Sequence, residues 1–560
     1  MHRFFFAAAV LLAVPATAQP LSSPFASALL AGLHAERQKD STAAADAFSR
    51  ALALDPMNRD LQRRAFLALA FDGRWADAVP LAERASADGA NIEAALLRAL
   101  IAARAGDAAA TRTALAAVDA AGVMARGEGD PRRQQTRLIA ARLASGLARA
   151  WVEGAARTDQ VEGALAEFGD ALAPFRALHI AMIRDWTGNA SAAEASYRAA
   201  ASGARPGWRI ASKLGHFLER QGRGVEAMEI YQTELQRGGD PDLVQPAIAR
   251  ARSSQPPAAP ISTLADGMAE AFYDLASLLQ SDEAGHDLAL LFVRYALFLR
   301  PDDPTMLFLL GDVIEDRGQR AAANAVYAAI PQAAPIRWAA RLKIAANRAE
   351  LGDVDGAAAE LSSLAAERTD RYDPLARLGD LYRTKERWAE AITAYDGALQ
   401  RIGLPTQRHW FLLFTRGIAL ERSKQWPRAE ADFKQALALQ PDQPMVLNYL
   451  GYSWIDQGVN LEEGKRMVER AVELRPRDGH IVDSLGWAYY RLGDYPKAVE
   501  WLERAVELKP TEAVILDHLG DALWKVGRQL EARFQWRRAL SFDADADLRG
   551  QIEKKLANGL

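Results

Sequence analysis

Small and large side chains recur along this chain at fixed distances. In the stretch LGWAYYRLGDYPKAVEWLERAVELKP, Gly486 is followed by Ala498, Leu502, Ala505 and Pro510, which lie 12, 16, 19 and 24 residues later. The same offsets, in whole or in part, follow six other glycines, namely Gly32, Gly215, Gly311, Gly379, Gly417 and Gly520. Recurrence at three, four and seven residues is typical of helical faces, and the proline marks a helix end. The pattern therefore predicts pairs of short helices.

The period of this pattern is close to 34 residues. Gly417, Gly451, Gly486 and Gly520 follow one another at intervals of 34, 35 and 34. A helix–turn–helix unit of this length is the tetratricopeptide signature, and a single unit cannot bury its own apolar face. We therefore predict an all-α superhelical solenoid of antiparallel helix pairs, with roughly 12–14 repeats. The alternative is an irregular helical bundle.

Each repeat position has an expected structural role. The glycine is expected where the first helix crosses the second closely, and the large residue 16 positions later is expected to fill the gap between successive repeats. Further glycines end first helices at turns such as Gly73, Gly106, Gly352 and Gly493. A glycine there tolerates the left-handed conformation that closes a helix.

Changes in composition divide the chain. Residues 122–135 are polar, contain Gly and Pro, and are predicted to form a loop. The expected segments are a signal peptide over 1–18, an N-terminal Ala-rich solenoid over 19–250, a Pro-rich linker or kink over 251–263, a C-terminal repeat array over 264–545 and a capping helix over 546–560.

The first residues, MHRFFFAAAVLLAVPATAQP, have the three parts of a secretory signal. Arg3 precedes a short apolar run, and Ala16 and Ala18 form a small-x-small cleavage site, so cleavage after Ala18 is expected. The alternative is a buried N-terminal helix. No later apolar run is long enough to span a bilayer. We expect an exported, soluble, periplasmic protein.

Charge and cysteine content exclude several classes of function. The formal net charge is −4 and no basic block occurs, which argues against nucleic acid and anionic membrane surfaces as partners. The chain has no cysteine, which excludes disulfides, thiolate metal sites, cysteine nucleophiles and a thioether lipid anchor.

No catalytic, cofactor-binding or metal-binding motif is visible. The eight histidines form no H-x-x-x-H pair, and neither a P-loop nor a G-x-S-x-G elbow occurs. We expect no enzyme, no cofactor and no metal. The alternative is a site whose residues converge from distant repeats.

The first helix of each repeat is expected to line a concave groove. Offsets −3, +1, +4 and +5 from the glycine point into such a groove, and in the last repeats they combine rings with polar groups, which suits peptide binding. The candidate groove residues are Asn448, Tyr452, Asp483, Trp487, Tyr490, Arg491, Asp517, Asp521 and Trp524, with Ile455, Asp456 and Lys525 at the remaining offsets. The alternative is that these rings pack between helices.

The offsets resemble the tetratricopeptide repeat family, which implies a scaffold for protein–protein contact. Chaperone-binding members hold a C-terminal carboxylate with Lys, Asn and Arg, whereas Asn448, Asp483 and Asp517 stand here, so that clamp is not expected. The run from Tyr449 to Leu540 is similar to the C-terminal repeats of long proteobacterial envelope proteins. These include a lipoprotein adaptor of a carboxy-terminal processing protease that trims cell-wall hydrolases.

The sequence thus leads to a functional hypothesis. We expect a non-catalytic periplasmic scaffold that binds other proteins, and the resemblance implies an adaptor whose partners are such a protease or cell-wall hydrolases. The missing lipobox cysteine separates this chain from the lipoproteins. The alternative is an assembly factor or structural subunit of a secretion, cell-wall or exopolysaccharide complex.

Overall fold

The structure is a computed structural model, in which part of the chain is described. The described residues are 23–86, 91–124, 131–156, 161–165, 168–202, 207–253 and 255–560. The expected signal peptide lies outside them. Among these residues, no helix is both long enough and apolar enough to cross a membrane.

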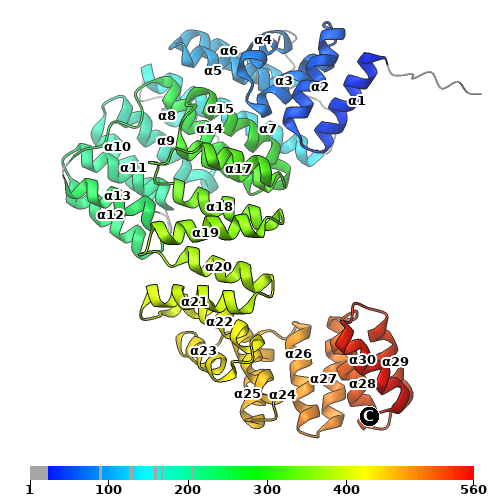
Figure 1. Cartoon of the computed structure of the whole chain (residues 1–560). Coiled ribbons are helices and arrows are strands. Elements are labelled where there is room, and N and C mark those ends of the chain that lie inside the picture. Colours follow the sequence, from blue (N-terminus) through cyan, green and yellow to red (C-terminus); the bar gives the residue numbers. More distant parts are fainter. Residues whose placement is uncertain are drawn as a thin grey trace, which may run out of the picture. The chain divides into compact units, whose positions relative to one another are not determined.

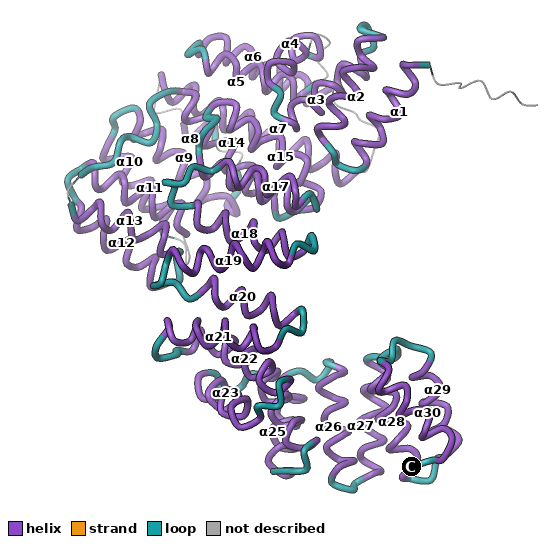
Figure 2. Tube along the Cα trace, viewed as in Figure 1, coloured by secondary structure: helices purple, strands orange, loops and turns teal. Residues whose placement is uncertain are grey.

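The fold is all-α. The described residues form thirty α-helices and no strand, and neighbouring helices pack as consecutive pairs (Figures 1 and 2). The predicted all-α solenoid of packed helix pairs is confirmed, and thirty helices correspond to fifteen pairs, slightly more than the 12–14 expected.

The chain divides into two compact units, Met1–Leu351 and Gly352–Leu560. The helices of the N-terminal unit are α1 (Pro24–Arg37), α2 (Ser41–Leu54), α3 (Arg59–Asp72), α4 (Trp75–Ala85), α5 (Ile92–Arg104), α6 (Ala108–Met124), α7 (Pro131–Ala156), α8 (Val161–Ala164), α9 (Ala173–Trp186), α10 (Ala190–Ala201), α11 (Gly207–Arg220), α12 (Gly224–Gln236), α13 (Pro241–Arg252), α14 (Leu264–Gln280), α15 (His286–Leu299), α16 (Pro304–Asp316), α17 (Arg320–Ala329) and α18 (Arg337–Glu350).

The C-terminal unit contains the most regular repeats. Its helices are α19 (Val354–Glu367), α20 (Asp373–Thr384), α21 (Trp388–Ile402), α22 (Trp410–Arg422), α23 (Trp426–Leu439), α24 (Pro444–Asp456), α25 (Leu461–Leu474), α26 (Gly479–Arg491), α27 (Tyr495–Leu508), α28 (Ala513–Lys525), α29 (Gln529–Leu540) and α30 (Ala546–Asn558). Short 3₁₀ turns also occur in the chain, at Asp170–Leu172, Glu283–Gly285 and Gln407–His409.

The repeated glycine and the large residue 16 positions later lie against each other. A Cβ placed on Gly311 would lie 2.3 Å from the ring of Tyr327, and one on Gly379 would lie 2.4 Å from the ring of Tyr395. The predicted close crossing of the two helices is therefore present. The large residue covers the glycine of its own repeat. At Phe433 it also reaches the next repeat, as expected, because its ring centroid lies 5.2 Å from that of Tyr449.

The turn glycines have the expected left-handed conformation. Gly73, Gly106, Gly352 and Gly493 all have φ between 76° and 87°. A Cβ would be strained there, which explains why glycine ends these helices.

The predicted loop over residues 122–135 is only partly correct. Helix α6 continues to Met124 and α7 begins at Pro131, so the polar run RRQQ is helical; residues 125–130 lie outside the described part. Proline at the first position of a helix loses no hydrogen bond, because that N–H has no partner inside the helix. The Pro-rich residues 255–263 contain no helix and precede α14 within the N-terminal unit.

In the N-terminal unit, the α14–α15 hairpin covers the first helices of earlier repeats. Helix α14 contacts α5, α7 and α9, and α15 contacts α3 and α5; Figure 1 shows the hairpin among them. The Arg294 guanidinium donates to the Phe71 carbonyl oxygen at 2.9 Å. In the N-terminal unit, the first helices that were expected to line a groove are therefore already covered by the chain itself.

Buried charges fix this hairpin. The Glu270 carboxylate of α14 is 3% exposed and lies 2.8 Å from Arg209, 2.9 Å from Lys213 and 2.7 Å from Arg300. Burial alone would raise the pKa of Glu270, but the three cations outweigh it and hold the pKa well below its usual range. Since Arg209 and Lys213 belong to α11, the hairpin is held against that helix by ion pairs.

Candidate functional site

The predicted groove residues all lie on α24, α26 and α28 of the C-terminal repeats. Helix α24 contacts α26, and α26 contacts α28, so the first helices of successive repeats lie side by side. Side chains at equivalent positions can therefore meet from one repeat to the next. The structure brings together Tyr452, Asp456, Asp483, Trp487, Tyr490, Asp517 and Asp521, which we call the aromatic–acidic face.

Asp483 and His518 form a buried pair between neighbouring repeats. His518 Nδ1 lies 3.0 Å from Asp483 Oδ1, and the two residues are 8% and 6% exposed. Burial alone would lower the pKa of His518, but Asp483, helped by Asp517 and Asp521, raises it above its ordinary value. The imidazolium form is thus favoured, and it links α26 to α28.

Asp517 and Asp521 share one cation. Lys555 Nζ of α30 donates to Asp517 Oδ2 at 2.7 Å and to Asp521 Oδ2 at 2.8 Å. The Trp536 indole N–H donates to the other oxygen of Asp521 at 3.0 Å. Burial and then the neighbouring Asp517 raise the pKa of Asp521, although Lys555 acts in the opposite direction. Two buried carboxylates therefore compete for one ammonium group.

The acidic residue that directly follows the repeat glycine also accepts a hydrogen bond from the large residue of the same repeat. The Tyr327 hydroxyl donates to Asp312 at 2.6 Å, and the Tyr395 hydroxyl donates to Asp380 at 2.7 Å. Asp521 holds the same position relative to Trp536. This predicted groove residue consequently has a structural role as well, because it satisfies a buried indole N–H.

Trp487 is stacked against two other rings. Its ring centroid lies 4.6 Å from that of Tyr490 at an interplanar angle of 10°, and 4.1 Å from that of His518 at 17°. Trp487 and Tyr490 are both partly exposed. The Trp487 indole nitrogen is buried and has no hydrogen-bond partner among the described residues. The ring is therefore part of the helix packing and part of the surface at once.

Trp524 lies against the C-terminal residues of the chain. Its indole N–H donates to the Leu560 carbonyl oxygen at 3.2 Å, and a Cβ placed on Gly559 would lie 2.3 Å from the ring. The Arg533 guanidinium lies 5.3 Å from the same ring. Although the sequence places Trp524 in the groove, the structure gives it contacts that anchor the end of the chain.

Tyr452, Asn448 and Arg491 complete the predicted set on α24 and α26. The Arg491 guanidinium donates to the Asp456 backbone oxygen at 2.7 Å and reaches its carboxylate at 3.4 Å. Tyr452 is half-buried, and burial together with Asp456 and Asp483 raises its pKa. Asn448 is half-buried, and its Oδ1 has no hydrogen-bond partner among the described residues.

Sequence reasoning missed His518 and Lys555. His518 lies 35 residues after its partner Asp483, and Lys555 lies 34 residues after its partner Asp521. Both distances equal the repeat period, so a search for opposite charges one period apart would have found them. Neither residue occupies one of the four groove offsets.

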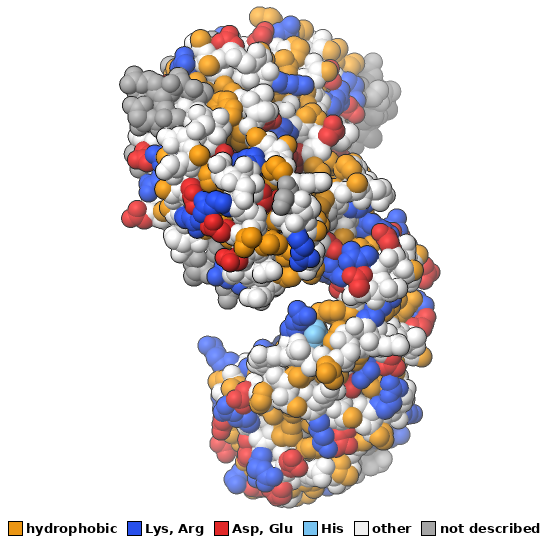
Figure 3. All heavy atoms as spheres, turned by 90° about the vertical axis from the view of Figure 1, so that its left-hand side faces the viewer, with side chains coloured by type: hydrophobic (Ala, Val, Ile, Leu, Met, Phe, Trp, Pro, Cys, Tyr) orange, Lys and Arg blue, Asp and Glu red, His pale blue; other side chains and the backbone are white. Residues whose placement is uncertain are grey.

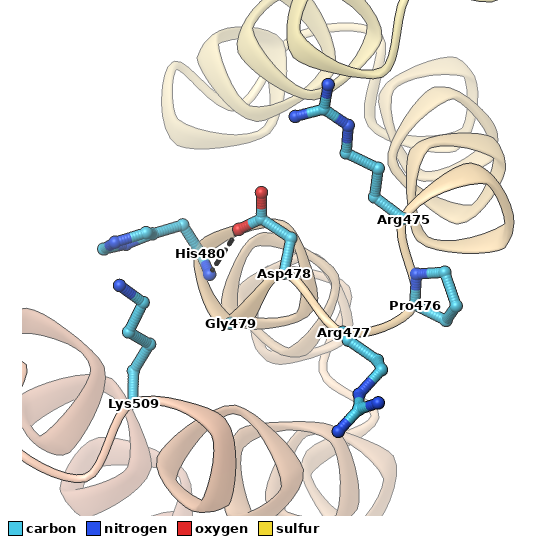
Figure 4. A pocket seen from close by; sticks show the side chains of 7 residues that line it. All are labelled: Arg475, Pro476, Arg477, Asp478, Gly479, His480 and Lys509. Carbon is cyan, nitrogen blue, oxygen red and sulfur yellow. Dashed lines mark hydrogen bonds between the residues drawn. The ribbon is translucent and has the colours of Figure 1, made fainter. Parts of the chain in front are cut away.

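A second surface feature is a basic hollow of about 550 Å³ where α25 ends and α26 begins (Figure 4). It is lined by Arg475, Arg477, His480 and Lys509, and the Asp478 carboxylate accepts a hydrogen bond from the His480 backbone N–H at 3.2 Å. Arg475 and Arg477 extend away from each other in Figure 4. The two arginines therefore do not converge on one position.

The charges on the molecular face in Figure 3 are mixed. Lys and Arg side chains lie among Asp and Glu side chains there, and neither sign dominates. Among the described residues, no group of three or more His, Asp or Glu side chains could hold a metal ion.

Comparison with protein families identifies the repeats. Residues 375–407 and 410–443 match the tetratricopeptide repeat, and residues 486–527 match a further TPR repeat family. These are tetratricopeptide repeats. They fall within α20–α23 and α26–α28, so part of the aromatic–acidic face lies inside a recognised repeat.

Relatives share the repeats rather than the whole chain. The TPR repeat-containing protein PA4667 of Pseudomonas aeruginosa is 35% identical over 91 residues, which cover 16% of this chain and 15% of that relative. A tetratricopeptide repeat protein from Parabacteroides merdae matches with 19% identity, 46% coverage of this chain, 99% coverage of its own and a TM-score of 0.38. A chain of the APC/C hetero-tetramer Cut9–Hcn1 matches with 16% identity, 96% coverage of both chains and a TM-score of 0.38.

Proposed function

We propose that this protein is a non-catalytic scaffold that binds other proteins through the aromatic–acidic face of its C-terminal tetratricopeptide repeats. The observation that carries the proposal is the row of partly exposed rings, Tyr452, Trp487 and Tyr490, on adjacent first helices beside fixed carboxylates. Rings supply contact area at a small cost in entropy, and polar groups fix the register of a bound segment.

The N-terminal unit supports this choice of surface. There the α14–α15 hairpin contacts α3, α5, α7 and α9, which are the first helices of their pairs. Buried ion pairs at Glu270 hold the hairpin in place. A partner segment would have to displace a packed core to reach those helices, whereas the rings of α24 and α26 are already partly exposed.

We further propose that the protein is exported to the periplasm and presents substrates to an envelope protease. Two features of the sequence support this role. The first twenty residues resemble a secretory signal, and the run from Tyr449 to Leu540 is similar to the C-terminal repeats of an envelope adaptor. The expected partners are a carboxy-terminal processing protease and cell-wall hydrolases.

Affinity capture tests the scaffold and its surface together. Residues 19–560 are immobilised, exposed to a periplasmic extract, and compared with the Trp487→Ala/Tyr490→Ala double variant by mass spectrometry. Trp501→Ala is the matched control, because it removes an indole from the second helix of the same repeat, where Arg504 lies 5.2 Å from the ring. Circular dichroism confirms that each variant is folded.

The outcomes separate the hypotheses. Capture of an envelope protease with cell-wall hydrolases, lost in the double variant and kept in Trp501→Ala, supports the adaptor. Faster substrate turnover by that protease in a purified mixture completes the case. Capture of a secretion or polysaccharide complex that persists in the double variant replaces the proposal with an assembly factor and moves the contact surface elsewhere.

A further inference from the structure

Four carboxylates lie on the aromatic–acidic face, and two of them share a single ammonium group. Asp483 is paired with His518, and Asp456 is paired with Arg491. The remaining two carboxylates depend on one cation from outside the face.

That remaining pair is Asp517 and Asp521, which share the ammonium group of Lys555. With His518 protonated, the first two pairs are neutral and the third keeps a net charge of about −1, because two carboxylates face one ammonium.

An oxygen without a partner marks the place of this imbalance. Asp517 is 4% exposed, its Oδ2 accepts from Lys555, and its Oδ1 has no hydrogen-bond partner among the described residues. A buried carboxylate oxygen without a donor is costly, because desolvation is not compensated. Asp517 Oδ1 therefore lacks a hydrogen-bond donor, and an added cation or N–H group would offset the cost of its burial.

The rings beside these carboxylates experience the same negative potential. Burial and then Asp521 and Asp517 raise the pKa of the Tyr490 hydroxyl to about 12. Burial, Asp456 and Asp483 likewise raise the pKa of Tyr452. Both phenols remain neutral, so each ring offers an electron-rich face near carboxylates. Such a surface attracts a cation and repels a carboxylate ligand.

The chain itself shows which group these carboxylates accept. Lys555 reaches them from α30, 38 residues after Asp517 and 34 residues after Asp521. Helix α30 thus supplies an ammonium group to α28, where a further repeat would otherwise follow. The excess carboxylate charge calls for a second cation of the same kind.

We propose that the aromatic–acidic face binds a lysine or arginine side chain of an extended partner segment, placed beside Tyr490 and within reach of Asp517 and Asp521. This inference rests on the proposed protein-binding function and adds the chemistry of the partner. The segment must carry a positive charge next to apolar residues. Carboxylates favour the cation, and the Tyr452 and Tyr490 rings favour its apolar stem and its apolar neighbours.

The basic hollow at Arg475 and Lys509 would select the opposite charge. Its two arginines diverge, however, and its lining residues are exposed, apart from Asp478 and Gly479. None of its lining residues has an unpartnered buried polar atom. The aromatic–acidic face is consequently the better supported site, and its ligand is cationic.

Selection from a random peptide library tests the inference directly. Phage displaying random 12-residue peptides are panned against the immobilised full-length protein and, in parallel, against the Trp487→Ala/Tyr490→Ala variant. We expect sequences enriched on the wild type only, with lysine and arginine at least about two-fold above their frequency in the input library.

Synthetic peptides then isolate the charge. The best selected peptide is compared with a version whose lysines are acetylated, or whose arginines are replaced by citrulline, using fluorescence anisotropy. We expect about five-fold or greater weakening, because a cation–π contact and a partly buried ion pair are lost together.

Two variants and one matched control locate the contact. Asp521→Asn removes a buried carboxylate, and Asp456→Asn removes an exposed one, whose side chain is 56% exposed and pairs with Arg491. Asp442→Asn is the control, because its side chain is 61% exposed and pairs with Arg470 away from the face. We expect weaker binding of the cationic peptide in the first two variants and less than about two-fold change in the control.

Each outcome decides one of the two proposals. Peptides that depend on Trp487 and Tyr490 but lack lysine and arginine overturn the cation inference and leave the binding surface standing. Equal enrichment on the wild type and the double variant overturns the surface itself, and the cation inference with it. Equal weakening in Asp456→Asn and Asp442→Asn attributes the effect to net charge and also overturns the inference. If Asp521→Asn does not fold, Asp456→Asn and the acetylated peptide still decide.

Discussion

The Tyr295 hydroxyl donates a hydrogen bond to the Glu93 backbone carbonyl oxygen across 2.7 Å and 202 residues of sequence. Tyr295 is fully buried on α15, and Glu93 lies in the first turn of α5. The bond joins the hairpin to a first helix that a simple solenoid would leave open. It therefore connects the α14–α15 hairpin directly to α5 within the N-terminal unit.

Removal of this hydroxyl should destabilise the N-terminal unit. We expect Tyr295→Phe to lower its free energy of unfolding by about 1–2 kcal/mol, because the buried carbonyl oxygen loses a donor. Urea unfolding monitored by hydrogen exchange of α5 measures the change. Tyr382→Phe, in the other unit, is the control and should leave exchange in α5 unaltered. If both variants behave alike in α5, the hydrogen bond does not stabilise this unit.

The His518–Asp483 pair should make the stability of the C-terminal unit depend on pH. The folded-state pKa of His518 lies above that of the unfolded chain, since Asp483, Asp517 and Asp521 outweigh burial. The stabilisation is therefore complete below about pH 6.5 and is lost as the pH rises through the folded-state pKa. Guanidinium unfolding at several pH values should show this decline in the wild type.

The matched variant for this titration is His518→Gln. It keeps a hydrogen-bonding side chain between Trp487 and Asp483 but cannot bind a proton. We expect a flatter dependence of stability on pH above about pH 6.5, the ordinary pKa of histidine. If wild type and variant decline equally over this interval, another group is responsible.

Lys555→Met should leave two buried carboxylates without their ammonium group. We expect a loss of about 3 kcal/mol in the C-terminal unit at neutral pH, because Asp517 and Asp521 then repel each other without compensation. The folded-state pKa of Asp521 should rise further above that of the unfolded chain, so acidification should recover part of the loss. Denaturant midpoints at pH 7 and pH 5 test both statements. A loss that is the same at both pH values would contradict them.

Two glycine substitutions should have opposite signs. Gly379→Ala places a methyl group 2.4 Å from the buried Tyr395 ring, and we expect a loss of about 2 kcal/mol from overpacking. Gly550→Ala lies within α30 where nothing is within 4 Å, and we expect a gain of up to about 1 kcal/mol from helix propensity. Thermal unfolding of the two variants compares them. If both variants lose stability, the helix propensity of Gly550 does not limit the stability of α30.

Much of the fold was predictable because each repeat is specified by residues close together in sequence. In every repeat that keeps the pattern, the large residue follows the glycine by 16 residues. Tyr395 follows Gly379 in this way, and the structure places the Tyr395 ring against Gly379. The left-handed turn at Gly493 was predictable for the same reason. Local patterns suffice where local packing decides the structure.

The candidate site was predictable only in part. The groove offsets selected Asp483, Trp487 and Tyr490, which the structure brings together with His518. They also selected Trp524, whose ring the structure places against the C-terminal residues of the chain. The offsets specify the face of a helix on which a residue lies, but not which neighbouring segment covers it.

The sequence by itself determined the helices, their pairing and the positions that face a neighbouring first helix, because these depend on spacings within one or two repeats. Only the tertiary structure decided that α14 and α15 cover the N-terminal first helices, and that Lys555 is shared by Asp517 and Asp521. The hairpin contacts join residues that are far apart in sequence and that no local periodicity relates. The Lys555 contacts lie after the last regular helix pair, where the repeat pattern no longer specifies the next residues. They depend on how the stacked repeats curve, which is the accumulated result of many small rotations between neighbouring helix pairs.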